Sequence, residues 1–139
     1  MTTEGDPTHG PEGGVTPYLS VVGAKAAVAF YTQAFGAQET FRNTADDGER
    51  LMHSRMLING AWVMVSDHFS EMMGGAPFTP PASVTLHLQV DDADVWWDRA
   101  VAAGATIRFP LADQFWGDRF GMIVDPFGHS WSIASKIKG

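Results

Sequence analysis

Two stretches of alternating sequence carry polar side chains that could bind a ligand or act on one. The first set is Thr16, Tyr18 and Ser20, and the second is Thr85, His87 and Gln89. Successive side chains of a strand point to opposite faces, so each set shares one face while its apolar neighbours occupy the other. Imidazole is the side chain best suited to proton transfer near neutral pH. His87 is therefore the candidate general base, with Tyr18 or Arg119 as the electrophile.

Both stretches belong to a long internal repeat, in which Val15–Phe41 aligns with Ser83–Phe109. Thr16 falls on Thr85, and Gly36, placed to end a helix, falls on Gly104. A repeat of this length exceeds the usual period of solenoid proteins. It predicts two similar half-domains.

Each half is expected to fold as β-α-β-β-β, which makes the fold class α+β. In the first half we expect strand Val15–Val22, helix Ala24–Phe35 and strands Gln38–Asn43, Leu51–Ile58 and Trp62–Ser66. In the second half we expect strand Ser83–Val90, helix Asp92–Ala103 and strands Thr106–Leu111, Arg119–Val124 and Ser130–Ser135. The expected boundaries are a disordered tail 1–14, a first module 15–67, a linker 68–82, a second module 83–135 and a C-terminal tail 136–139.

Composition narrows the class of protein. The chain has 139 residues, 45% hydrophobic content and a net charge of −7, which is typical of a globular protein with a core. The acidic balance argues against a nucleic-acid partner. No apolar run reaches the ~20 residues of a membrane span, and no secretory signal is evident. There are no cysteines, which excludes disulfides and thiolate sites. We expect a cytoplasmic protein.

The matched polar faces predict a concave pocket. If the two sheets curl toward each other, their Tyr and His faces would line a cleft. The alternative is that these faces are simply exposed to solvent. Two further candidates are Trp116, in the loop before the strand Arg119–Val124, and Arg119, at the start of that strand. Trp116 could stack on a ligand and Arg119 could hold an anion; alternatively, Asp118 or Asp125 pairs with Arg119 and the aromatic residues seal the sheet edge.

Four motifs resemble the vicinal-oxygen-chelate superfamily, which contains glyoxalases, bleomycin-resistance proteins and ring-cleaving dioxygenases, and within it the PhnB-like branch. They are TPYLSV (Thr16–Val21), AFYTQAFGA (Ala29–Ala37), VMVSD (Val63–Asp67) and QFWGDRFGMIVDPFGHSWSIA (Gln114–Ala134). The resemblance covers Val15–Ser135. It implies paired βαβββ modules that form a curved mixed sheet around a cleft, and a homodimer.

Family enzymes hold a divalent metal with His or Glu from the first and last strands of each module. The resemblance places those positions at Thr16, Met64, Thr85 and Ser132. Because metals of this kind prefer imidazole, carboxylate or thiolate, we predict no metal and no other cofactor. A relocated metal would need His53 and His87 together with a third ligand such as Asp67 or Glu49.

These observations lead to three alternative hypotheses for the function. The first is a metal-free cleft that binds a small, partly aromatic or amphipathic molecule. The candidate ligand-binding residues are Thr16, Tyr18, Ser20, His53, Met64, Thr85, His87, Gln89, Trp116, Arg119 and Ser132. The second is a vicinal-oxygen-chelate enzyme (lyase, isomerase or dioxygenase) with relocated metal ligands, or a metal-free enzyme with His87 as general base. The third is a regulatory or structural dimer without a ligand.

Overall fold

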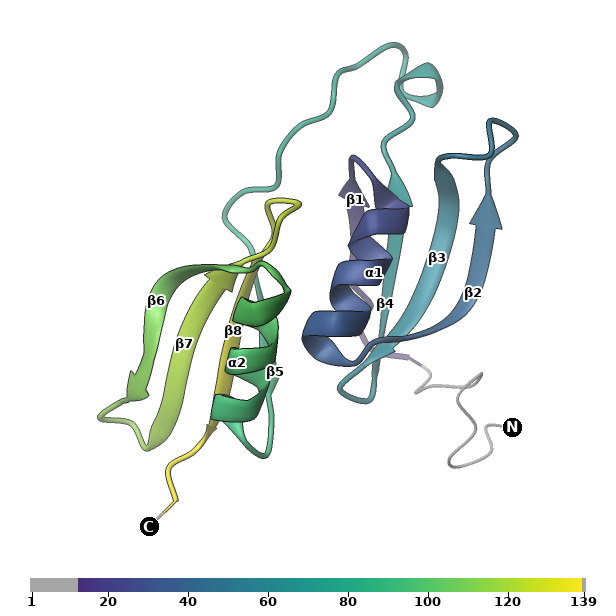
Figure 1. Ribbon diagram of the computed structural model, residues 1–139. Coiled ribbons are helices and arrows are strands. Elements are labelled where there is room, and N and C mark those ends of the chain that lie inside the picture. The colour runs from purple at the N-terminus through teal and green to yellow at the C-terminus, as the bar shows by residue number, and fades with distance from the viewer. Residues whose placement is uncertain (1–12, 139) are drawn as a thin grey trace. The chain divides into compact units, whose positions relative to one another are not determined.

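The computed structural model describes residues 13–138, which form two modules of the same architecture (Figure 1). The first module contains β1 (Tyr18–Val21), α1 (Ala24–Phe35), β2 (Gln38–Thr44), β3 (Leu51–Ile58) and β4 (Ala61–Asp67). The second contains β5 (Thr85–Gln89), α2 (Ala93–Ala103), β6 (Thr106–Asp113), β7 (Asp118–Val124) and β8 (Ser130–Lys136). Most of the predicted tail, including His9, lies outside the described residues.

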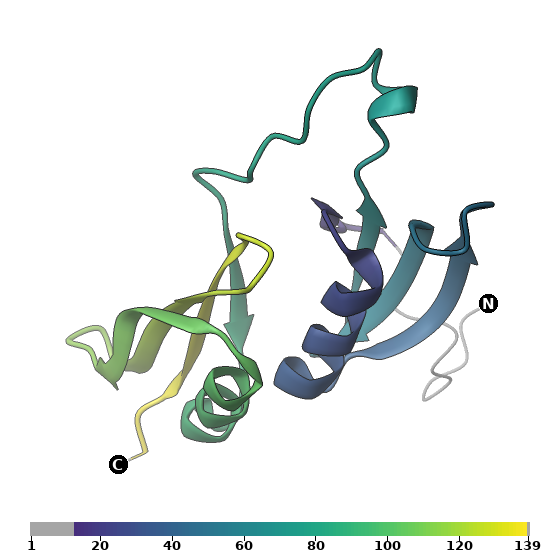
Figure 2. The same ribbon diagram turned by 45° about the horizontal axis from the view of Figure 1, so that its top comes forward.

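Each module has its own four-stranded mixed sheet. The strand orders are β1-β4-β3-β2 and β5-β8-β7-β6, so the first and last strands of each module are neighbours. Those two pair in parallel, and the remaining pairs are antiparallel. Each helix lies along one face of its own sheet (Figure 2). The predicted α+β class with two βαβββ modules is confirmed.

The described part of the chain forms two compact units. One holds residues 13–32 and 36–79, and the other holds residues 33–35 and 80–138.

Local sequence explains where the helices begin and end. Gly36 follows α1 with φ 65°, in the left-handed region that glycine adopts without strain, and its N–H donates to the carbonyl of Thr32. At the start of α2 the Asp92 carboxylate accepts the N–H of Val95 at 3.3 Å, so Asp92 is the N-cap of this helix. Asn59 and Gly60 both have positive φ, as a two-residue hairpin of type I′ requires.

The first strand of each module is shorter than predicted. β1 begins at Tyr18, not at Val15, which is 97% exposed. Pro17 lacks an N–H, and it joins the ladder only through its carbonyl, which accepts the N–H of Met64 at 2.9 Å. Thr16 therefore precedes the strand. β5 begins at Thr85 because Ser83 has φ 61°, which is incompatible with a strand.

The core of the second module requires a glycine. Trp97 of α2 lies over the backbone of Gly121 in β7, and both are buried. A Cβ at Gly121 would lie 2.5 Å from Cζ3 of Trp97 and 2.9 Å from the Cα of Leu111. Such distances are well inside van der Waals contact, so only glycine allows α2 to pack this closely.

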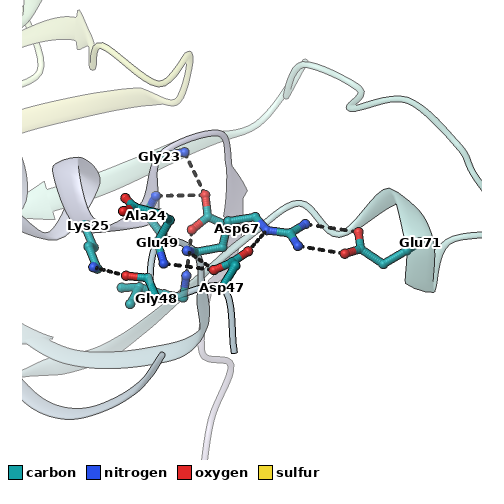
Figure 3. A network of polar contacts seen from close by, with 10 residues as sticks. Gly23, Ala24, Lys25, Asp47, Gly48, Glu49, Asp67 and Glu71 are labelled. Atoms are coloured by element: carbon teal, nitrogen blue, oxygen red, sulfur yellow. Dashed lines mark hydrogen bonds and ion pairs between the residues drawn. The ribbon is translucent and has the colours of Figure 1, made fainter. Parts of the chain in front are cut away.

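In the first module, one buried carboxylate ties three segments together (Figure 3). Asp67, at the end of β4, accepts the N–H groups of Gly23 and Ala24 at 2.7 and 3.0 Å. Its second oxygen accepts the N–H of Leu51 at 2.8 Å. Asp67 thus caps α1 from a distant strand, since Gly23 has no side chain to do so.

The start of the predicted linker is anchored to the turn between β2 and β3. Residues Ser70–Met72 form a short 3-10 helix, η1. Both terminal nitrogens of Arg50 bind the carboxylate of Glu71, at 3.0 and 2.7 Å (Figure 3). The same guanidinium lies 4.3 Å from the ring centre of Phe69 and donates from Nε to Asp47 at 2.7 Å.

Candidate ligand-binding faces

The candidate site of the second module lies on the sheet face opposite α2. Strand register places His87 beside Ser132, Ser132 beside Met122, and Met122 beside Phe109. These four residues form one row across β5, β8, β7 and β6. The alternation predicted for Thr85, His87 and Gln89 is confirmed, since all three are exposed while Leu88 between them is buried.

Both ring nitrogens of His87 are engaged. Nε2 lies 2.8 Å from Oε1 of Gln89, and Nδ1 lies 2.6 Å from Oγ of Ser132. An amide oxygen can only accept, so Nε2 carries the proton. In the neutral ring, Nδ1 then accepts from the Ser132 hydroxyl. Ser132 is only 3% exposed, so its role is to orient the imidazole rather than to attack a substrate.

Aromatic side chains surround this imidazole. The ring of Phe120 stacks on His87 with centroids 6.2 Å apart. Phe109 and Trp116 each make edge contacts with Phe120, at 6.1 and 5.6 Å. Trp116 was predicted as a candidate, whereas Phe109 and Phe120 were not. The alternation of β7 could have identified Phe120, because it sits two residues before Met122 on the same face.

A cavity of about 420 Å³ opens beside this row. It is lined by Ser83, Val84, Thr85, Arg108, Met122 and Ser130. Nη1 of Arg108 donates to Oγ of Ser130 at 2.8 Å. The lining combines a guanidinium with several hydroxyls and contains no carboxylate, which suits a hydrogen-bonding or anionic group. Thr85, predicted from the sequence, is part of it.

The first module repeats this row with different side chains. Register places Tyr18 beside Met64, Met64 beside Arg55, and Arg55 beside Phe41. The Tyr18 hydroxyl lies 2.9 Å from Nδ1 of His53, so the structure brings these two candidates together. Arg55 was not predicted, although it is two residues from His53 on the same strand.

Within β1–β4, which the structure describes in full, the sheet face that carries this row has no acidic side chain. From the burial pattern and register, its residues are Tyr18, Ser20, Gln38, Phe41, Asn43, His53, Arg55, Leu57, Trp62, Met64 and Ser66. The acids of the module lie elsewhere. Glu39 binds buried Ser54 at 2.6 Å on the helix side, Asp67 caps α1, and Asp46, Asp47 and Glu49 lie in the turn after β2.

Arg119 lies apart from the other candidates. Its guanidinium binds Asp94 at 3.0 Å and Asp113 at 3.1 Å. The predicted partners, Asp118 and Asp125, were therefore wrong, because β7 directs Arg119 toward the start of α2. The Asp94 carboxylate, followed by that of Asp113, raises the pKa of Arg119. The charge available for an external anion is already balanced.

The donor groups do not form a metal site within residues 13–138, where no three His, Cys, Asp or Glu residues are placed to hold an ion. Thr16 is half-buried ahead of β1, and Met64, Thr85 and Ser132 supply no charge. Asp67, considered as a relocated ligand, has both oxygens committed to backbone N–H groups.

Within residues 13–138, neither helix is long and apolar enough to cross a bilayer.

Two βαβββ modules, with candidate residues on the first and last strands of each, define the class of protein. The family model for the glyoxalase/bleomycin resistance protein/dioxygenase superfamily matches residues 16–133. The chain therefore belongs to this superfamily.

Relatives in sequence and structure agree with that assignment. Uncharacterized protein Mb0911c of Mycobacterium bovis is 43% identical over 131 residues, which cover 91% of this chain and 86% of that protein. The crystal structure of TioX from Micromonospora sp. ML1 is similar with a TM-score of 0.71 and 27% identity, covering 91% of this chain and 100% of that one. A glyoxalase-related enzyme from Fulvimarina pelagi has a TM-score of 0.71 and 25% identity, covering 91% and 89%.

Proposed function

We propose that the protein binds a small, partly aromatic molecule on the open face of its second sheet, without a metal. The observation that carries this proposal is the double hydrogen bonding of His87. A general base must lie within hydrogen-bond reach of the substrate proton that it abstracts, whereas here Nε2 of His87 faces Gln89 and Nδ1 faces the buried hydroxyl of Ser132. The imidazole is instead held as a fixed, flat surface stacked on Phe120.

The ligand's two ends follow from the side chains of the site. Its aromatic part packs against His87 and Phe120, with Trp116 at the margin. Its polar group enters the cavity lined by Thr85, Ser130 and Arg108.

We further propose that the protein is a cytoplasmic homodimer and that it belongs to the PhnB-like branch of the superfamily. The family motifs and the absence of cysteines support these assignments.

A ligand titration with His87→Ala tests the proposal. Isotope-labelled protein is titrated with a set of bicyclic aromatic amides and alcohols, and the side-chain signals of His87 and Gln89 are followed by NMR. We expect at least one compound to shift these signals. In His87→Ala the affinity for that compound should fall about tenfold, which corresponds to about 1.4 kcal/mol of binding free energy. His68→Ala, in the linker, is the matched control. Unchanged affinity in His87→Ala would contradict the proposal.

A further inference from the structure

We propose that the open face of the first sheet holds a second site, which binds a planar aromatic anion such as an aryl carboxylate through Arg55. This goes beyond the function proposed above, because it uses no residue of the second module. It starts from the guanidinium of Arg55, which is half-buried yet has no carboxylate partner among the described residues.

The Arg55 side chain is held in place, but some of its N–H groups have no hydrogen-bond acceptor in the described part of the protein. Its guanidinium carbon lies 4.2 Å from the ring centre of Trp62, and Nε donates a long hydrogen bond of 3.4 Å to Oγ1 of Thr40. Stacking on an aromatic face leaves the in-plane N–H groups available as a fork for two carboxylate oxygens. Every buried side-chain nitrogen or oxygen in residues 13–138 has a hydrogen-bond partner. The terminal N–H groups of Arg55 have no such partner in this range, so they are not buried and are in contact with solvent.

The surrounding charge favours an anion. The chain carries a net charge of −7, yet β1–β4 place no carboxylate on this sheet face. Of the other described arginines in the module, Arg42 pairs with Glu39 at 2.9 Å and Arg50 pairs with Asp47 and Glu71. Arg55 alone among these three has no acidic partner to screen it.

The repeat shows that the fold does not need an arginine at this position. By register, Arg55 occupies the place in the first sheet that Met122 occupies in the second. An apolar side chain therefore fits the same scaffold site. Beside Arg55, Phe41 and the Tyr18–His53 pair offer flat surfaces, with Phe41 and His53 centroids 5.9 Å apart. A planar ring carrying one carboxylate complements both features.

The test compares 1-naphthoate with its neutral analogue 1-naphthamide on the full chain. NMR follows the Nε–H signal of Arg55 and the indole signal of Trp62 during each titration. We expect both signals to move and naphthoate to bind at least tenfold more tightly than naphthamide, with the difference shrinking as salt is added. Equal affinities, or movement confined to other signals, would overturn the proposal.

Variants separate this site from its surroundings. Arg55→Met, which installs the residue found at the matched position, should abolish the preference for naphthoate, and Arg55→Lys should keep only part of it. Arg42→Met is the control, since Arg42 lies on the helix side and is paired; it should retain the full preference. Loss of the preference in Arg42→Met would overturn the assignment to Arg55.

Two further measurements distinguish anion binding at this site from binding in the second module and from a contact between copies of the chain. His87→Ala should leave the naphthoate preference intact, and its loss there would show that the anion does not bind in the first module. If the Arg55 signal moved with protein concentration alone, the face would be a contact between copies of the chain. That result would also overturn the proposal.

Discussion

The hydroxyl of Ser132 lies 2.6 Å from Nδ1 of His87, and the two residues are direct cross-strand neighbours on β8 and β5. Because Gln89 accepts from Nε2 on the other side of the ring, the imidazole is fixed in one tautomer. A buried hydroxyl thus sets the orientation of an exposed aromatic surface.

Ser132→Ala should release that tautomer. We expect the ¹⁵N signals of His87 to change from the Nε2–H pattern to a mixture, because without the hydroxyl the ring can turn over and donate to Gln89 from either nitrogen. Stability should fall by about 1 kcal/mol, the usual net value of one hydrogen bond. Ser130→Ala, on the same face, is the control and should preserve the pattern. An unchanged His87 spectrum in Ser132→Ala would show that the hydroxyl does not set the tautomer.

Gly121→Ala should destabilise the second module. The new methyl would overlap the ring of Trp97 and the backbone of Leu111, and overpacking of this kind costs about 1–3 kcal/mol. Urea denaturation measures the change. In a Trp97→Leu background the same substitution should cost less, because the ring is removed while Leu111 remains. A cost equal in both backgrounds would argue that Trp97 is not the obstacle.

Asp67→Asn should weaken the junction of α1 with β3 and β4. The amide offers one acceptor oxygen where the carboxylate offers two, so at least one N–H among Gly23, Ala24 and Leu51 loses its partner. We expect a loss of about 2 kcal/mol in the free energy of unfolding. Asp46→Asn, an exposed position in the nearby turn, should be neutral. Equal midpoints for the two variants would refute the capping role.

The turn after β2 should respond to acid through Asp47. Hydrogen bonds from the backbone N–H groups of Arg50 and Glu49, and then from the Arg50 side chain, lower the pKa of Asp47 from 3.8 to about 2. A depressed folded-state pKa means that the stabilisation is complete above about pH 4 and is lost as the pH falls toward 2.

Carboxyl ¹³C titrations measure this effect directly. In Arg50→Gln the pKa of Asp47 should rise, because its side-chain partner is removed while the backbone donors remain. The pKa of Glu71 is lowered chiefly by its hydrogen bond with Arg50, so it should return toward its ordinary range in the same variant. An unshifted Glu71 would show that Arg50 does not anchor η1 in solution.

The repeat in the sequence was enough to predict the two modules and the alternation of His87 with buried Leu88. Strand starts were less predictable, because they depended on the missing N–H of Pro17 and the left-handed backbone of Ser83. The partners of Arg119 were predicted wrongly because Asp94 is distant in the sequence and becomes a neighbour only through packing of α2. Arg55 was missed because nothing local distinguishes an unpaired arginine from a paired one. The ligand-binding role of the candidate residues stays a prediction.

The matched rows of the two sheets also bear on how the protein could have diverged. One backbone register places a tyrosine, a thioether, a guanidinium and a phenyl ring in the first module, and an imidazole, a hydroxyl, a thioether and a phenyl ring in the second. The hydrogen bonds that define the register involve only the main chain, so exchanging these side chains leaves the strand pairing intact. Each half is therefore free to change its chemistry independently while the duplicated architecture is inherited unchanged.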